Sequence, residues 1–411
     1  MRSSGSCRNS SGATANPFAR FVLTMYKILT LNNISIKGLE RLPRERYEVA
    51  SEIQNPDAIL LRSYNMHDMA VPSTLKAVGR AGAGVNNIPV AQLSARGIPV
   101  FNAPGANANA VKELVVAAML LAARNICPAW DYARRLEGDD KTIHKLVEDG
   151  KKKFVGFELP NRTLGVIGLG AIGVQVANAA IKLGMKVIGY DPNVTVQSAW
   201  RLSSDVRKAN SLEEILMAAD FLTLHVPEVD ATRRMINRDR LRLLKNGMVL
   251  LNFAREGVVE TEAVLEGLKS GRIRNYVCDF PSAVFRDFPQ VVALPHLGAS
   301  TEEAEDNCAV MVADQVREFL ENGSIVNAVN FPDVEMTRLD GHRIAIANSN
   351  VPNMVGQIST AMAEAGLNII DMINKSRGEI AYTMADVDKV LPESVVKKIA
   401  SIDGVLSVRV L

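Results

Sequence analysis

The chain has 411 residues, of which 47% are apolar and 22% are charged, an ordinary composition for a globular protein of two or three domains. Its formal charge of +2 excludes the basic footprint expected of a nucleic-acid-binding protein. No apolar run reaches the roughly 18 residues that a membrane-spanning helix needs. The four cysteines form no CxxC pair, so we expect free thiols in a reducing compartment and no metal site.

The N-terminal segment differs from the rest of the chain. Residues 1–24 are rich in serine and arginine, and the first acidic residue is Glu40. This composition suits a transit peptide, which would direct the protein to a mitochondrion or a plastid. The alternatives are a disordered extension or an upstream start ahead of Met25, and in both cases we expect a cytoplasmic protein.

Short apolar segments alternate with helical ones in the next part of the chain. Strands are predicted at residues 26–31, 57–61 and 98–101, and helices at 72–78 and 111–124. Such alternation argues for parallel βαβ units.

A second α/β series opens near residue 163. An apolar strand at residues 164–167 leads directly into Gly168-Leu-Gly170-Ala-Ile-Gly173, which opens a predicted helix. The next strand, 186–190, ends at Asp191. Further strands are predicted at residues 221–226, 248–253, 276–278 and 291–294. Two Ser-x-x-Glu capping boxes, Ser211–Glu214 and Ser300–Glu303, predict helix starts.

The glycine motif predicts a dinucleotide site because it lies between a strand and a helix. Gly168 allows the tight turn, Gly170 lets a pyrophosphate approach the main chain, and Gly173 permits close helix–strand packing. The helix N-terminus attracts the phosphate charge. Asp191 would accept hydrogen bonds from the adenosine ribose and repel a 2′-phosphate, so NAD is favoured over NADP.

The tail of the chain has a different pattern. After a connection at residues 323–341, the predicted order is strand 343–347, helix 353–365, strands 368–374 and 380–385, helix 392–401 and strand 405–410. This order is the split βαββαβ layout, which predicts a further domain.

An arginine and a histidine follow two predicted buried strands. Arg255 lies in Asn252-Phe-Ala-Arg255, and His296 lies in Pro295-His296-Leu-Gly-Ala-Ser-Thr301. Ligands bind at the carboxyl ends of strands in open α/β sheets. Arginine offers a fixed fork for the carboxylate of a 2-hydroxy acid, and histidine can take up and return the proton of its hydroxyl.

With these motifs, residues 26–411 resemble the D-3-phosphoglycerate dehydrogenases, a branch of the D-2-hydroxyacid dehydrogenase family. The resemblance implies an α/β fold with two Rossmann-like or flavodoxin-like doubly wound parallel sheets and a C-terminal ferredoxin-like ACT domain. The implied domains are substrate-binding (25–123 and 300–335), NAD-binding (124–299) and regulatory (341–411).

The resemblance also implies roles for individual residues. Arg255 and His296 would be catalytic. The implied cofactor contacts are Gly168, Gly170, Ala171, Ile172, Gly173, Asp191, Val226, Pro227, Ala254, Asp279, Gly298 and Ala299. The implied substrate contacts are Arg62, Ser63, Ala83, Gly84, Val85 and Asn107.

Two positions depart from the family pattern. The glycine that normally follows the catalytic arginine is Glu256 here, and the glutamate that normally hydrogen-bonds the histidine is absent from the segment after Asp279. The histidine therefore lacks its orienting acid or takes one from elsewhere.

The ACT resemblance implies serine as an effector, bound by Asn348, Asn350 and Asn368, since asparagine side chains both donate and accept hydrogen bonds. The alternative is an ACT domain that only holds subunits together. A homo-oligomer, a dimer or a tetramer, is expected.

The resemblance therefore implies NAD-dependent oxidation of 3-phospho-D-glycerate to 3-phosphohydroxypyruvate. One alternative is another D-2-hydroxyacid dehydrogenase, such as a glyoxylate or hydroxypyruvate reductase. The other is a non-catalytic NAD-sensing scaffold, which the missing glutamate would permit.

Overall fold

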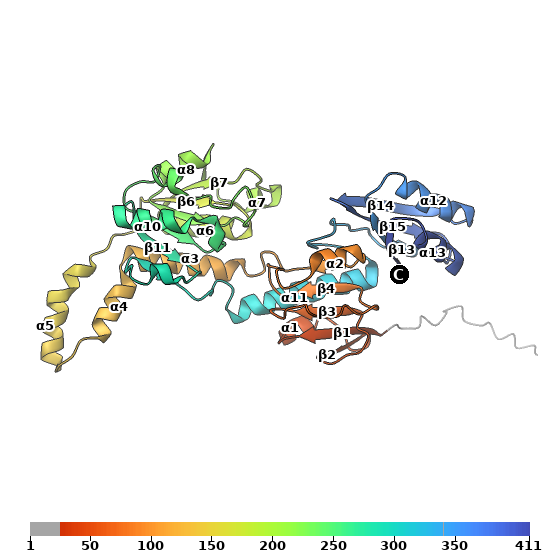
Figure 1. Cartoon of the computed structure of the whole chain (residues 1–411), viewed down its shortest axis with the longest axis horizontal. Coiled ribbons are helices and arrows are strands. Elements are labelled where there is room, and N and C mark those ends of the chain that lie inside the picture. The colour runs from red at the N-terminus through yellow and green to blue at the C-terminus, as the bar shows by residue number, and fades with distance from the viewer. Residues whose placement is uncertain (1–24, 340) are drawn as a thin grey trace, which may run out of the picture.

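The computed structural model describes residues 25–339 and 341–411, so the N-terminal segment, for which a transit peptide was one interpretation, lies outside the described residues. Three α/β bodies lie in a row, each built on its own sheet (Figure 1). Among the described residues, no helix combines the length and the apolar character that a membrane crossing requires.

The first sheet has the order β2-β1-β3-β4-β5, and all of its strands are parallel. Its strands are β1 (Tyr26–Leu31), β2 (Tyr47–Ala50), β3 (Ala58–Leu61), β4 (Ala77–Arg80) and β5 (Val100–Phe101), with short helices α1 (Ile36–Leu39) and α2 (Val90–Ala95). The long helix α11 (Glu302–Asn322) packs its apolar face into the core of this sheet. The helix predicted at residues 72–78 is wrong, because a turn there leads into the buried strand β4.

The second sheet is also parallel, in the order β12-β11-β10-β9-β6-β7-β8. Its strands are β6 (Thr163–Ile167), β7 (Lys186–Tyr190), β8 (Arg207–Lys208), β9 (Phe221–Leu224), β10 (Met248–Asn252), β11 (Ile273–Cys278) and β12 (Val291–Ala293). Its helices are α6 (Ala171–Lys182), α7 (Val196–Arg201), α8 (Leu212–Ala218), α9 (Arg238–Leu241) and α10 (Thr261–Ser270), with 3-10 turns η2 (Glu256–Val258) and η3 (Ala283–Phe285). The strand order reverses beside β6, where open α/β sheets bind ligands.

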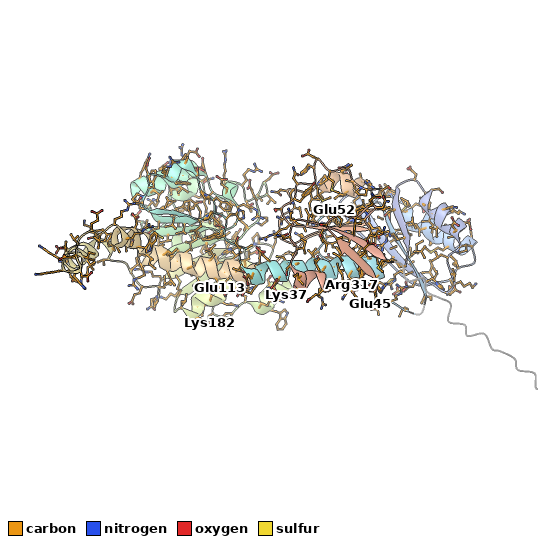
Figure 2. All side chains as sticks on the ribbon, turned by 90° about the horizontal axis from the view of Figure 1, so that it is seen from below. Lys37, Glu45, Glu52, Glu113, Lys182 and Arg317 are labelled. Carbon is orange, nitrogen blue, oxygen red and sulfur yellow. The ribbon has the colours of Figure 1, made fainter. Side chains whose placement is uncertain are left out.

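Two helices join the first two bodies. Helix α3 (Ala108–Ala123) and helix α11 run nearly in line beneath the sheets, as the side-chain view from below shows (Figure 2). Val115 and Met119 of α3 are fully buried in the core of the second sheet. The implied domain boundaries assign α3 to the first body, but its apolar face packs with the second.

A helical hairpin extends from the second body. It is formed by α4 (Ile126–Arg134), α5 (Asp140–Gly150) and a 3-10 turn, η1 (Lys151–Phe154), and it projects away from the sheets (Figure 1). The Tyr132 hydroxyl donates to the Leu146 carbonyl and joins the two helices.

The C-terminal sheet is antiparallel, in the order β14-β15-β13-β16. The chain order is β13 (His342–Ser349), α12 (Met354–Glu364), β14 (Ile369–Arg377), β15 (Ile380–Val387), α13 (Glu393–Ala400) and β16 (Val405–Val410), so the predicted βαββαβ layout is confirmed. One face of the sheet packs on α12 and α13, and the other shares a core with α11.

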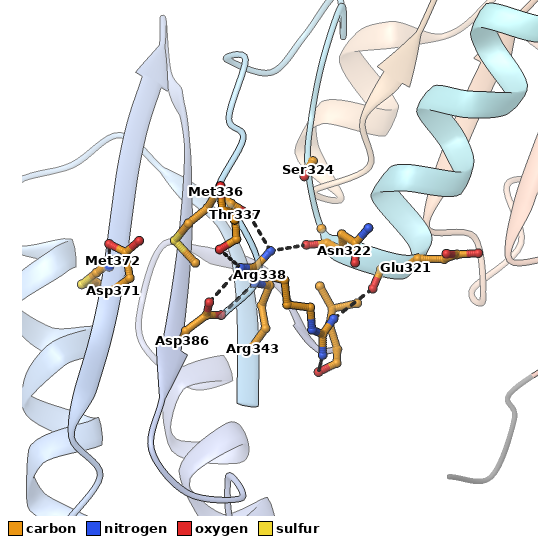
Figure 3. Close-up of polar contacts among 12 residues, drawn as sticks. Glu321, Asn322, Ser324, Met336, Thr337, Arg338, Arg343, Asp371, Met372 and Asp386 are labelled. Atoms are coloured by element: carbon orange, nitrogen blue, oxygen red, sulfur yellow. Dashed lines mark hydrogen bonds and ion pairs between the residues drawn. The ribbon is translucent and has the colours of Figure 1, made fainter. Parts of the chain in front are cut away.

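The C-terminal end of α11 is held by side chains from outside the helix. Its last carbonyls would otherwise lack partners. The donors are Arg409 to the Phe319 and Leu320 carbonyls, Arg338 to Glu321, Arg343 to Asn322 and Tyr382 to Gly323. Arg343 and Asp386 form a fully buried ion pair at 2.7 Å beside this end (Figure 3). Cations at a helix C-terminus also complement its dipole.

Candidate active site

The glycine motif forms the turn from β6 to α6. Gly168 has φ of +90°, and a Cβ atom there would lie 2.5 Å from the His225 carbonyl oxygen. A Cβ on Gly173 would lie 1.9 Å from the Gly168 oxygen, so the helix can approach the strand only with glycine at that position. Both geometries match the roles predicted for these glycines.

The same turn leaves room for a pyrophosphate. A Cβ on Gly170 would meet nothing within 4 Å, and Gly170 caps α6 without a side-chain hydrogen bond. The first-turn N–H groups of Ala171 and Ile172 therefore have no capping partner, and a helix N-terminus with open N–H groups attracts phosphate.

Asp191 follows β7 and is half-buried. Its Oδ2 accepts from the Leu169 N–H and its Oδ1 from the Asn193 N–H, each at 2.8 Å. These bonds hold the carboxylate beside the glycine turn. The residues present therefore fit an adenine dinucleotide.

Arg255 follows β10 and is exposed. Its Nη1 donates to the Ala254 carbonyl at 2.7 Å. Asn252, which is fully buried, donates to the Arg255 carbonyl and accepts from the Ala254 N–H, so it holds the turn that carries the guanidinium.

His296 follows β12 and has φ of +57°, a conformation that is uncommon outside glycine. Asp279, buried at the end of β11, holds the loop after it: Oδ1 accepts from the Leu297 N–H at 2.7 Å and Oδ2 from the Gly298 N–H at 2.8 Å. Because β11 lies between β10 and β12, Arg255 and His296 come from strands on either side of Asp279.

An aromatic ring, Phe280, packs against the histidine. The ring centroids of Phe280 and His296 lie 5.6 Å apart at an interplanar angle of 81°. The chain then enters η3, where Phe285 packs on Tyr276. Across residues 25–339 and 341–411, no ion pair joins His296 to an acid.

The first body faces Arg255 through the loop at residues 83–85. A Cβ on Gly84 would lie 3.9 Å from Nη2 of Arg255. The buried Asn102 donates to the Ala83 carbonyl at 2.6 Å and fixes this loop. Residues predicted to bind substrate and the predicted catalytic arginine therefore meet across the two bodies.

Two asparagines hold the loop that carries Arg62 and Ser63. The side-chain oxygen of Asn32 accepts from the Ser63 N–H at 3.1 Å. The Asn87 amide donates to the Arg62 carbonyl at 3.1 Å, and its oxygen accepts from Nε of Arg80 at 3.1 Å. Asn87 thus holds the Arg62 main chain and the Arg80 side chain close to each other.

Arg80, at the end of β4, is a candidate site residue that the sequence analysis missed. Burial lowers its pKa, and the charges of Arg62 and Arg255 lower it further, so the three guanidinium groups share one region. Arg62 forms an ion pair with Glu305 of α11 at 2.6 Å. An arginine at the end of a strand was a usable signal, but the wrong prediction of a helix at residues 72–78 concealed the strand.

The remaining predicted contacts surround the same turns. A Cβ on Gly168 would also lie 3.0 Å from a Val226 methyl group. Pro227 follows Val226 after β9, Ala299 follows the loop held by Asp279, and Asn107 is the N-cap of α3.

The three predicted effector residues do not lie together within one chain. Asn348 is buried, with its Oδ1 unpartnered, and Asn350 donates to the Gly378 carbonyl. The Asn368 N–H donates to Asp388, at the opposite end of β15. The separation along the strand is roughly 25–30 Å, so one small molecule cannot reach all three residues in a single chain.

The glycine turn, the acid after β7 and the paired strand-end arginine and histidine are the features of a nicotinamide-dependent dehydrogenase. Residues 116–298 match the family model for the D-isomer specific 2-hydroxyacid dehydrogenase NAD binding domain. The chain therefore belongs to the D-2-hydroxyacid dehydrogenase family, and it is an NAD-dependent oxidoreductase.

Individual relatives agree with this family. The chain is 36% identical over 384 residues to a D-3-phosphoglycerate dehydrogenase of Methanocaldococcus jannaschii, covering 89% of this chain and 70% of the relative. It is 33% identical over 349 residues to that of Haemophilus influenzae, covering 82% and 81%. An NAD+-bound 3-phosphoglycerate dehydrogenase structure from Entamoeba histolytica shares the fold, with a TM-score of 0.59, 24% identity and coverage of 74% of this chain and 99% of that one.

Proposed function

We propose that this enzyme oxidises 3-phospho-D-glycerate to 3-phosphohydroxypyruvate, which opens the phosphorylated route to L-serine. The carrying observation is that Asn87 bonds both the Arg80 guanidinium and the Arg62 carbonyl, while Arg255 lies against the 83–85 loop of the same body. A substrate with an anion at each end needs positive charge at two points, and guanidinium groups bind carboxylate and phosphate through paired hydrogen bonds. The relatives named for this reaction support the choice.

In this mechanism the residues of the chain bind and orient the substrate. Arg255 anchors the carboxylate, Arg62 and Arg80 receive the phosphate, and the backbone of the 83–85 loop donates to the substrate. His296 accepts the hydroxyl proton as C2 is oxidised. NAD, held by the glycine turn and Asp191, supplies the hydride acceptor. Asp279 keeps the His296 loop in place, and the Phe280 ring packs edge to face against the imidazole.

Assembly and regulation are part of the same proposal. A dimer or tetramer brings the Asn348 and Asn350 end of one C-terminal sheet toward Asn368 of a second copy, which gives serine a composite site. A fall in activity with added serine, accompanied by no change in subunit number, tests the effector role.

A turnover assay tests the function. NADH oxidation with 3-phosphohydroxypyruvate should far exceed that with glyoxylate or hydroxypyruvate. A preference for the unphosphorylated acids would identify a glyoxylate or hydroxypyruvate reductase. NAD binding without turnover of any of the three keto acids would identify a non-catalytic sensing scaffold.

Substitution of the anchoring arginine tests the mechanism. Arg255→Ala should lower kcat/KM by about 100-fold or more, because a charge-assisted bidentate contact is lost. The matched control is Arg286→Ala, an exposed arginine in the segment after β11. A change within about threefold for Arg255→Ala would contradict the assignment.

A further inference from the structure

The phosphate-binding arginine already has an acid partner. Nη1 of Arg62 lies 2.6 Å from Oε1 of Glu305, in the first turn of α11. Neither Arg80 nor Arg255 has an ion-pair partner among the residues that the structure describes. Of these three arginines, only Arg62 is paired with a carboxylate among the described residues.

The pair is accessible enough to exchange. The side chains of Arg62 and Glu305 are 37% and 45% exposed. Ion pairs of such exposure contribute little to stability and are screened by solvent, so an incoming anion with a larger charge can take the place of the carboxylate. A phosphomonoester carries close to two negative charges near neutral pH and offers three acceptor oxygens.

We propose that Glu305 is an internal counter-ion that the distal phosphate of the substrate displaces from Arg62. This inference rests on the proposed function. Glu305 is held beside Arg62 by the chain. A distal group with a single negative charge is attracted to Arg62 no more strongly than the Glu305 carboxylate is, whereas a dianionic phosphate is attracted more strongly. Glu305 therefore competes with the distal phosphate for Arg62 and raises the KM for phosphorylated 2-hydroxy acids.

The electrostatics set the expected size of the effect. Two unit charges about 4 Å apart interact by roughly 1 kcal/mol in a water-like medium, which corresponds to about fivefold in affinity. Glu305→Gln removes the competing charge, so the KM for 3-phosphohydroxypyruvate should fall by about fivefold. The KM for hydroxypyruvate, which has no distal charge, should not change.

A matched control separates this local pair from the general charge of the helix. Glu302→Gln removes a carboxylate from the same first turn of α11, and Glu302 forms no ion pair within the described residues. It should leave both KM values unchanged. Inorganic phosphate, used as a competitive inhibitor of the NADH-loaded enzyme, should bind more tightly to Glu305→Gln and not to Glu302→Gln.

The outcomes distinguish this inference from the proposed function. If the wild-type enzyme does not reduce 3-phosphohydroxypyruvate, the proposed function is wrong. If the wild-type enzyme reduces it, the inference is overturned when Glu305→Gln leaves that KM unchanged or raises it, or when Glu302→Gln lowers it equally. Glu305→Asp keeps an acid in the helix turn but shortens its reach, so it should lower the same KM if Glu305→Gln does not fold.

Discussion

The conformation of the loop that carries His296 depends on a single residue, Asp279. His296 has φ of +57°, and such a conformation in a non-glycine residue persists only when its surroundings determine it. Both carboxylate oxygens of Asp279 accept backbone N–H bonds just after it. Asp279 therefore positions the His296 loop, in addition to the cofactor role that the resemblance implies.

Asp279→Asn should lower the rate of keto-acid reduction at saturating substrate and cofactor. The asparagine amide group would point an N–H at one of the two backbone donors, and an unsatisfied buried polar group costs about 1–3 kcal/mol. We expect a fall of about tenfold to 100-fold in kcat. Asp287→Asn, in the same connection but exposed, is the control and should retain activity. Equal turnover in both variants would remove Asp279 from the support of this loop.

His225 has a structural role and makes stability depend on pH. Its Nε2 lies 3.0 Å from the Thr223 hydroxyl, while Nδ1 is buried without a partner, although the residue as a whole reaches the surface in part. Burial lowers the pKa of His225 from 6.5 to about 3. Between pH 6.5 and about pH 3, His225 of the unfolded chain binds a proton that the folded chain does not bind. The free energy of unfolding therefore falls as the pH drops below about 6.5.

His225→Gln should weaken this pH dependence. Between pH 7 and pH 5.5 the wild-type protein should lose about 1.2 kcal/mol more unfolding free energy than the variant. Denaturant unfolding followed at both pH values measures the difference. Equal losses of unfolding free energy in the two proteins would show that His225 takes up a proton in the folded state as readily as in the unfolded state.

At the scale of elements, the end of α11 depends on a buried ion pair. Arg343 donates to both Asp386 oxygens and to the carbonyls of Asn322, Met336 and Thr337. Arg343→Met should lower the free energy of unfolding by about 3–5 kcal/mol, because Asp386 stays buried without its partner. The double variant with Asp386→Leu should recover much of the loss. A single variant within about 1 kcal/mol of the wild type would mean that water reaches this pair.

Sequence patterns predict the elements whose apolar runs are long or whose caps are standard. The strands at 26–31, 186–190 and 405–410 have the predicted bounds, and Ser211 caps α8 as expected, with its Oγ accepting from the Glu214 N–H. The cap of α11 is Thr301 rather than Ser300, because two adjacent hydroxyl residues satisfy the same pattern.

The remaining errors have physical causes. Pro72 and the following residues resemble a helix start, yet burial between β3 and β5 makes Ala77–Arg80 a strand. The α4–α5 hairpin was missed because polar residues dominate α5, and no residue of that helix except Gly150 is buried. The contact between Phe280 and His296 joins two loops and leaves no periodic signal in the sequence.

At the scale of the molecule, the C-terminal body and the first body share a hydrophobic core. Tyr382 and Met384 of the C-terminal sheet share one core with Phe319 and Leu320 of α11. The two bodies should therefore lose structure together, because neither core face is complete alone.

Met384→Ala tests this shared core. It should destabilise the protein by about 2–5 kcal/mol, and hydrogen exchange should accelerate in β1–β4 as well as in residues 342–411. Met362→Ala, in α12 and buried against the opposite face of the same sheet, should accelerate exchange mainly in the C-terminal body. Acceleration confined to residues 342–411 in both variants would show that the two bodies open separately.

Helix α11 also connects the C-terminal body to the residues around His296. Its first turn follows the His296 loop and bears Glu305, and its last turn is gripped by the C-terminal body. A helix of 21 residues is about 31 Å long, so a tilt of about 5° at the gripped end carries the other end through nearly 3 Å. That travel equals the length of a hydrogen bond. A rotation of that size at the C-terminal sheet, if α11 followed it as a rigid rod, would separate Glu305 from Arg62.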